Sequence, residues 1–199
     1  SLTNSGTTTV TITQITDGTY AGGINANNAV DIAVNIPVTS SVSIATPTVS
    51  PICAGTSVTF TATPTNGGTP TYQWKLNGST NVGTNSPTYT TTTLANGDQV
   101  SCEMTSTLCA SPNPATSNTI TMAVNSRPAS NINGTTTVCT GQSATLSINV
   151  TATGAWTMNI DNGVGTVTGT GNAVITKTVN PALTTTYTVT SLSDANCSA

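Results

Sequence analysis

The residues of this chain whose chemistry is most readily assigned are its five cysteines. They are Cys53, Cys102, Cys109, Cys139 and Cys197. The chain has no histidine and no C-x-x-C pair, so the usual ligand set of a zinc site is missing. We therefore expect disulfide bonds, and an odd number of cysteines leaves at least one without a partner inside the chain.

Acid–base catalysis has few groups to use in this sequence. Without histidine, it would depend on carboxylates, Lys, Tyr or Cys. The carboxylates are scattered, and most stand in turn sequences, where Asp is an ordinary residue. They are Asp17, Asp31, Asp98, Glu103, Asp161 and Asp194. Residues 165–171 contain a G-x-G sequence without a following helix pattern, which predicts a turn and not a phosphate loop. We expect no enzyme activity, no metal and no cofactor.

The composition predicts an all-β chain with a nearly uncharged surface. Only 5% of the 199 residues are charged, and the net charge is −3. The abundant β-branched Thr and Val favour strands, and helical periodicity is missing. Such a chain has no basic surface for nucleic acid, and no apolar run approaches the roughly 18 residues that span a bilayer. We expect neither nucleic-acid binding nor membrane insertion.

Apolar and polar residues alternate in several segments, which predicts strands. These segments are residues 7–13, 30–36, 57–62, 71–76, 87–93, 100–104, 120–124 and 188–190. Asn77-Gly78 is a strong hairpin signal. Four aromatic residues are expected in the core and not on a sugar-stacking surface. They are Phe60, Tyr72, Trp74 and Trp156.

The spacing of Cys53, Trp74 and a distal cysteine is typical of an immunoglobulin-like sandwich. Residues 138–146 repeat the pattern of residues 52–60, and Trp156 then takes the place of Trp74. Residues 188–195 in turn match residues 11–18, so the two ends of the chain align with each other. This is the pattern of a window cut from a tandem array.

The expected fold is therefore a set of tandem immunoglobulin-like β-sandwich domains in an elongated array. Residues 1–38 would be the C-terminal strands of a preceding domain. Residues 39–125 would be a complete domain, which we call the middle repeat. Residues 126–199, the third repeat, would be a domain that lacks its last strand.

Several sequence stretches also resemble a known family. In the middle repeat they are residues 52–68, 72–74, 85–89 and 94–98, and in the third repeat they are residues 184–190 and 194–197. With these stretches the chain resembles the immunoglobulin-like, PKD-like tandem repeats of giant Bacteroidota cell-surface adhesins, such as the SprB-type adhesins of gliding motility. The resemblance implies an extracellular protein at the bacterial cell surface that is exported by type IX secretion.

The sequence leaves the pairing of the cysteines open. In an immunoglobulin-type topology, the strand after Cys53 and the strand before Cys109 run in the same direction, so these sulfurs would lie at opposite ends. About seven residues at roughly 3.3 Å each exceed the Cα separation of about 7 Å that a disulfide tolerates. Two alternatives remain. Either Cys102 and Cys109 close a local loop, or the leading cysteine of one domain bridges the distal cysteine of its neighbour, as Cys53 to Cys197.

The expected function is a structural segment of a stalk or filament for attachment or gliding. Linkers of only a few residues would hold the relative orientation of neighbouring β-domains. The partners would be neighbouring repeats of the same chain and other copies in a fibre. A module that binds surface glycans or abiotic surfaces, or accessory repeats of a secreted enzyme, are the alternatives.

Overall fold

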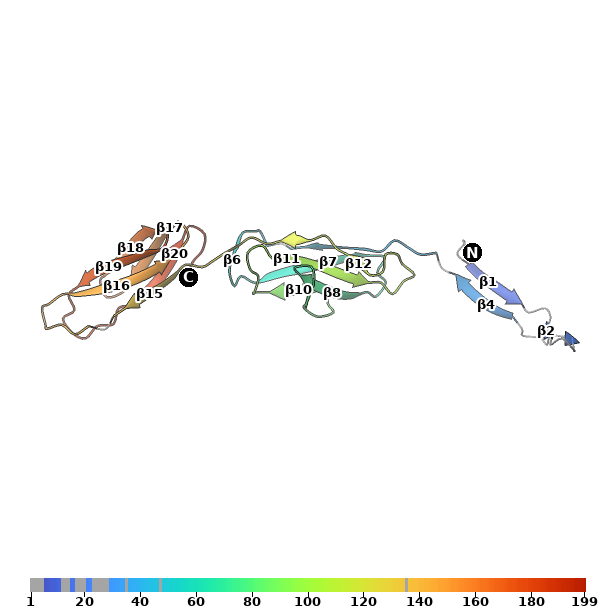
Figure 1. Cartoon of the computed structure of the whole chain (residues 1–199), viewed down its shortest axis with the longest axis horizontal. Coiled ribbons are helices and arrows are strands. Elements are labelled where there is room, and N and C mark those ends of the chain that lie inside the picture. The colour runs from blue at the N-terminus through green and yellow to red at the C-terminus, as the bar shows by residue number, and fades with distance from the viewer. Residues whose placement is uncertain are drawn as a thin grey trace. The chain divides into compact units, whose positions relative to one another are not determined.

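A computed structural model describes most of the chain, with side chains described from residue 36 onward. The described residues are 6–11, 15–16, 21–22, 29–34, 36–46, 48–134 and 136–199. They form strands, turns and loops without a helix, so the prediction of an all-β protein is confirmed (Figure 1). Accordingly, nothing in the described part is a helix of sufficient length and hydropathy to cross a membrane.

Two antiparallel pairs form at the N-terminal end. Strands β1 (Gly6–Thr11) and β4 (Ala29–Val34) pair with Gly6 opposite Val34 and Thr11 opposite Ala29. The short strands β2 (Ile15–Thr16) and β3 (Ala21–Gly22) form the second pair. Strands were predicted at residues 7–13 and 30–36, and both exist, although residues 12–13 and 35 lie outside the described part.

The chain divides into two compact units. Unit 1 comprises residues 1–45, 61–88 and 101–119, and unit 2 comprises residues 46–60, 89–100 and 120–199. The boundaries fall inside β7 (Val58–Thr65), β10 (Thr88–Thr91) and β11 (Gln99–Thr105), which are strands of the middle repeat. The domain limits expected from the sequence remain predictions.

The strands of the middle repeat form three sheets. One sheet has the order β10-β7-β5, where β5 is Ser41–Ala45. The second sheet has the order β12-β11-β8-β9, and β13 also pairs with β11. Their bounds are Thr71–Leu76 for β8, Thr80–Val82 for β9, Ala115–Thr116 for β12 and Ile120–Thr121 for β13. The third sheet is a parallel pair of β6 (Ile52–Cys53) and β14 (Val124–Asn125).

The hairpin between β8 and β9 turns at Asn77-Gly78, as predicted. Leu76 lies opposite Thr80, and both turn residues have positive φ angles, 53° for Asn77 and 79° for Gly78. Three residues, Asn77, Gly78 and Ser79, connect the paired strand ends. Asn and Gly tolerate the two positive φ angles better than other residues, which is why Asn-Gly is a strong hairpin signal.

Burial alternates along the strands of the middle repeat. In β7, Val58 and Phe60 are fully buried, whereas Thr61 is exposed. Trp74 is also fully buried, and its indole Nε1 donates a hydrogen bond to the carbonyl of Ser86 at 2.9 Å. Tyr72, the remaining predicted core aromatic of this repeat, is half-buried.

Two three-stranded sheets enclose the core of the third repeat. One has the order β15-β16-β19 and the other the order β18-β17-β20. Their bounds are Ala129–Asn133 for β15, Ala144–Thr151 for β16, Ala155–Ile160 for β17, Gly165–Thr170 for β18, Ala173–Val179 for β19 and Val189–Asp194 for β20. One buried apolar cluster contains residues of both sheets, for example Ile148 of β16 from one sheet and Trp156 of β17 and Leu192 of β20 from the other. This packing is consistent with a β-sandwich.

The turn predicted at residues 165–171 is wrong for residues 165–170, because they form strand β18. Gly171 lies in the bend that follows the strand, with a φ angle of 61°. Strand β18 pairs with β17 along its whole length, from Gly165 opposite Ile160 to Thr170 opposite Ala155. Gly169 lies opposite Trp156, and a Cβ atom there would overlap the indole ring. The glycine is therefore a strand residue that leaves room for a large neighbour and does not mark a turn.

Candidate functional site: the cysteine junction

The cysteine junction is a disulfide with the loops around it, residues 52–56, 125–127 and 194–198, all within unit 2. Cys53 and Cys197 form the bond, with 5.8 Å between their Cα atoms and a sequence separation of 144. Of the two pairings that the sequence left open, the structure therefore contains the one that joins different repeats. The local Cys102–Cys109 loop is wrong, because Cys102 is a thiol buried in the core.

The leading loop of the junction follows strand β6. Cys53 ends the strand, and its carbonyl accepts a hydrogen bond from the backbone N–H of Thr56 at 3.0 Å. Gly55 occupies this turn with a φ angle of 82°, a conformation that favours glycine. The turn keeps Cys53 half-buried at the end of its strand.

The distal loop is held by the carboxylate of Asp194 at the end of β20. Its Oδ1 accepts hydrogen bonds from the backbone N–H groups of Asn196 at 2.9 Å and Cys197 at 2.8 Å. Its Oδ2 accepts a hydrogen bond from the N–H of Thr153 at 2.9 Å. An Asp that bonds the backbone two and three residues ahead closes a tight turn, which here brings the Cys197 sulfur to Cys53.

These hydrogen bonds lower the pKa of Asp194 below its ordinary value of 3.8. The bond from Thr153 contributes most, those from Asn196 and Cys197 add to it, and partial desolvation opposes them. Hydrogen bonding to the charged form is the physical cause, since N–H donors favour a carboxylate over a carboxylic acid. Asp194 is thus a positioning residue of the junction.

Acid is expected to loosen the distal loop through Asp194. A lowered folded pKa stabilises the native state above the unfolded pKa, and this contribution is lost as pH falls through the folded value. The melting temperature of the wild type should therefore fall more steeply below about pH 4 than that of Asp194→Asn. Asn keeps one acceptor oxygen for residues 196 and 197 but cannot accept from Thr153. The melting temperatures of both proteins are measured by circular dichroism from pH 6 to pH 2. An equal fall in the two proteins would contradict the role assigned to Asp194.

Backbone pairing places the leading cysteine beside the end of the middle repeat. In the parallel pair of β6 and β14, Ile52 lies opposite Val124 and Cys53 opposite Asn125. The N–H of Ala54 donates to the Asn125 carbonyl at 2.8 Å. Cys53 is therefore held next to the segment that leads into the third repeat.

Arg127 joins the two loops of the junction without a covalent bond. Its Nε donates to the carbonyl of Ala54 at 2.8 Å, and its Nη1 donates to the carbonyl of Ser198 at 2.5 Å. A guanidinium suits this position because its donors are fixed in a planar fork. The sequence interpretation missed this residue. The available signal was that it is the only arginine of a chain almost without charges and stands at a predicted domain limit.

The other cysteines have different surroundings. Cys102 is fully buried, and burial raises its pKa to about 11 although a hydrogen bond from the Gln73 backbone opposes the shift. It is therefore a protonated core residue and not a nucleophile. Cys139 is exposed and carries the same turn as Cys53, with Gln142 N–H donating to its carbonyl at 3.0 Å. Cys109 is exposed, and its carbonyl accepts the N–H of Val38 at 2.8 Å.

The described carboxylates stabilise local structure. The Asp98 Oδ2 accepts the Ala95 N–H at 2.8 Å, and Glu103 forms an ion pair with Lys75 at 3.3 Å. The Asp161 Oδ1 accepts a backbone N–H from residue 188 at 2.7 Å. Among the described residues, no three Cys, Asp or Glu side chains form a group that could hold a metal ion. The carboxylate of residue 17 lies outside the described part, and the side chain of residue 31 is not described.

Comparison with protein-family models finds no matching family, and comparison with curated proteins finds no matching sequence. The class of protein is therefore described from its fold and its cysteine junction alone. It is an all-β protein in which two cysteine loops, distant in sequence, are joined covalently.

Proposed function

We propose that this chain is a structural segment of a stalk or filament in a large extracellular bacterial adhesin, built from immunoglobulin-like repeats. The observation that carries the proposal is the Cys53–Cys197 bond between the leading loop of the middle repeat and the distal loop of the third repeat. A bond of this kind ties successive repeats together instead of stabilising one of them.

The bond has a direct mechanical consequence. A force applied at the two ends of the chain passes from Cys53 to Cys197 through the sulfur atoms. The 144-residue separation between these cysteines is thereby bypassed, so most of both repeats carries no tension. A segment that transmits load without unfolding its domains suits a stalk.

Three further features support the proposal. The parallel β6–β14 pair and the Arg127 hydrogen bonds hold the same junction without covalent bonds. The low charge leaves little salt-sensitive repulsion between neighbouring repeats. A structural disulfide persists in oxidising surroundings, which supports a location outside the cell.

We also propose that the chain is not itself an enzyme, because its described carboxylates are engaged in turns and one ion pair.

Single-molecule stretching of the chain by its ends tests the load-bearing role. In the oxidised chain, the residues between the bonded cysteines should contribute nothing to the final extension. Reduction should then add about 500 Å, which corresponds to the 144-residue separation at roughly 3.5 Å per residue. The control Cys139→Ser should behave as the wild type. Full extension of the oxidised chain would contradict the mechanical role.

A glycan panel separates a stalk from a binding module. A stalk segment should bind no member of a broad panel in the oxidised form. The aromatic side chains that could stack on sugars are mostly inside, since Phe60, Trp74 and Trp156 are buried. Specific binding of one glycan class would overturn the stalk proposal in favour of the binding module.

A further inference from the structure

Strand β5 stands between the N-terminal part of the chain and the cysteine junction. A load applied at the two ends of the chain follows the backbone through β5 to Cys53 and then crosses the disulfide to Cys197. We call residues 38–53 the loaded segment and residues 54–196 the bypassed sequence. The loaded segment carries the tension, whereas the strands on which β5 is folded belong to the bypassed sequence.

Hydrogen bonds fix the start of the loaded segment to the bypassed sequence. The N–H of Val38 donates to the carbonyl of Cys109 at 2.8 Å, and the carbonyl of Val38 accepts the N–H of Ser111 at 2.9 Å. The side-chain amide of Asn66 donates to the carbonyl of Thr39 at 2.7 Å. A pull on the chain must break these bonds before it can draw β5 away.

Strand β5 is attached to the bypassed sequence through one edge and one face. It is the last strand in the order β10-β7-β5 and pairs antiparallel with β7 along its whole length. Two of its side chains, Val42 and Ile44, are buried. Detaching β5 therefore costs one ladder of backbone hydrogen bonds and the burial of two apolar side chains, while the pairing among the bypassed strands is kept.

Asn118 holds the other edge of β5 at a single residue. Its Oδ1 accepts the N–H of Ile44 at 2.8 Å, and its Nδ2 donates to the carbonyl of Ile44 at 3.1 Å. The side-chain amide thus bonds both backbone groups of one strand residue, as a residue of a neighbouring antiparallel strand does. Since Asn118 belongs to the bypassed sequence, it clamps the loaded strand to the part that bears no tension.

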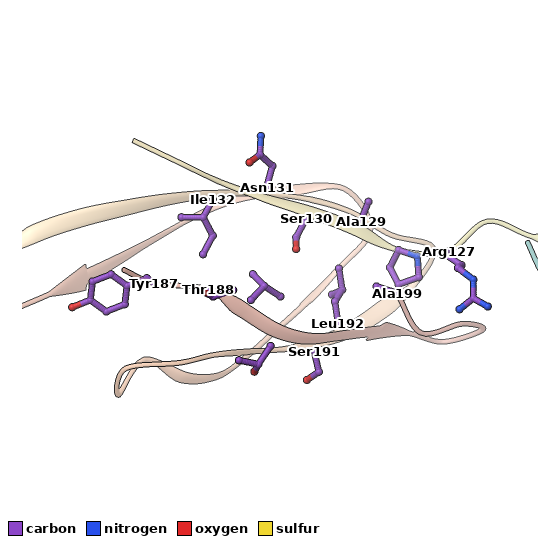
Figure 2. Close-up of a pocket in the computed structure, with 13 residues that line it drawn as sticks. Arg127, Ala129, Ser130, Asn131, Ile132, Tyr187, Thr188, Ser191, Leu192 and Ala199 are labelled. Carbon is purple, nitrogen blue, oxygen red and sulfur yellow. The ribbon is translucent and has the colours of Figure 1, made fainter. Parts of the chain in front are cut away.

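The third repeat contains a comparable strand that is not loaded. Strand β15 is the first strand of this repeat and pairs with β16 at one end of the order β15-β16-β19. Its Ile132 packs against the apolar core, and in Figure 2 this side chain points into the space between β15 and β20. Because β15 lies between the bonded cysteines, it bears no tension in the oxidised chain.

We propose that β5 is a force-released strap. Under load it detaches from β7 and Asn118, while the bypassed sequence stays folded. The disulfide limits the gain in length to at most about 50 Å, which is the length of the 15 peptide units between residues 38 and 53 at roughly 3.5 Å each. When the load falls, β7 is still in place for β5 to pair with. The strap rests on the proposed stalk function, since only a chain under load uses it.

Stretching the oxidised chain by its ends at constant force tests the strap. The chain should show a reversible step of at most about 50 Å. Asn118→Ala should raise the rate of this step at a given force roughly tenfold, because both hydrogen bonds to Ile44 are lost. Asn118 is exposed, so the alanine leaves no cavity. The control Asn172→Ala changes an exposed residue of the bypassed sequence, whose Oδ1 accepts the N–H of Ala152 at 3.1 Å, and should leave the rate unchanged.

A second pair of variants compares the loaded strand with the unloaded one. Ile44→Ala in β5 should also raise the rate of the step, whereas Ile132→Ala in β15 should not. The residues before the loaded segment add the same length in every variant, so they do not affect the comparison.

The outcomes separate the strap from the stalk. If Asn118→Ala or Ile44→Ala leaves the rate unchanged while the bypassed sequence stays folded, the strap is overturned and the stalk proposal stands. An equal effect of the two control variants would overturn the strap as well, because the step would then not arise from β5. Full extension of the oxidised chain would overturn the strap and the stalk proposal together.

Discussion

Replacing Cys53 and Cys197 together by serine is expected to lower the free energy of unfolding by about 5 kcal/mol, the chain-entropy value for a closed loop of this 144-residue separation. Without the bond, the unfolded chain regains the freedom of a very long loop. The loss is about a third or more of the 5–15 kcal/mol by which a folded domain is typically stable. The cysteine junction should therefore be the most important single element of stability in this chain.

Urea unfolding followed by tryptophan fluorescence measures this effect. Trp74 and Trp156 both lie within the sequence that the disulfide closes, so each reports on the repeat that contains it. The double serine variant should unfold at a lower urea concentration, and the reduced wild type should match it. Cys139→Ser, which alters an exposed thiol in the same kind of turn, is the control and should leave the midpoint unchanged. Equal midpoints for the oxidised wild type and the double variant would refute the expectation.

Trp156→Ala is expected to destabilise the third repeat by about 3–5 kcal/mol, the usual cost of removing a buried aromatic side chain. The indole is only 2% exposed and belongs to the core cluster of both sheets. It lies against Gly169, where no side chain could fill the space left behind without a rearrangement. Its Nε1 also donates a hydrogen bond to the carbonyl of Gly171 at 2.9 Å.

Trp156→Phe separates the contribution of apolar packing from that of the indole hydrogen bond. Phenylalanine keeps much of the apolar contact but cannot donate to Gly171, so its loss should be smaller than that of the alanine variant. In both variants the remaining tryptophan, Trp74, reports on the middle repeat alone. Circular dichroism follows the whole chain, so a transition that Trp74 fluorescence does not share arises outside the middle repeat. If the alanine substitution lowers the free energy of unfolding by less than about 1 kcal/mol, the indole ring is not essential for packing this core.

Much of the strand structure could be predicted because strand patterns are local. The alternation of Val58 and Phe60 with threonine indicated a half-buried strand, and β7 has this burial pattern. Asn77-Gly78 indicated a hairpin because the pair tolerates positive φ angles, and the structure has both. These properties depend on neighbouring residues, which the sequence lists in order.

Sequence patterns failed for residues whose structural role depends on contacts with residues far away in the chain. The glycines of residues 165–171 predict a turn because glycine is common in turns, yet Gly169 is a strand residue that makes room for Trp156. Arg127 stands out in the sequence as the only arginine, but the sequence does not identify its hydrogen-bond acceptors, which are the carbonyls of Ala54 and Ser198. Both roles depend on the chain path and not on local sequence.

The cysteines show the same division. Their number, the missing histidine and the matching loops of the repeats determined from sequence alone that disulfides were the expected chemistry, and reduced the pairing to two alternatives. Only the tertiary structure decided between them. A disulfide requires two Cα atoms within about 7 Å, and the 5.8 Å between Cys53 and Cys197 arises from two loops placed by β6 and β20. Distance through space between residues so far apart in the chain is set by packing, which no local pattern encodes.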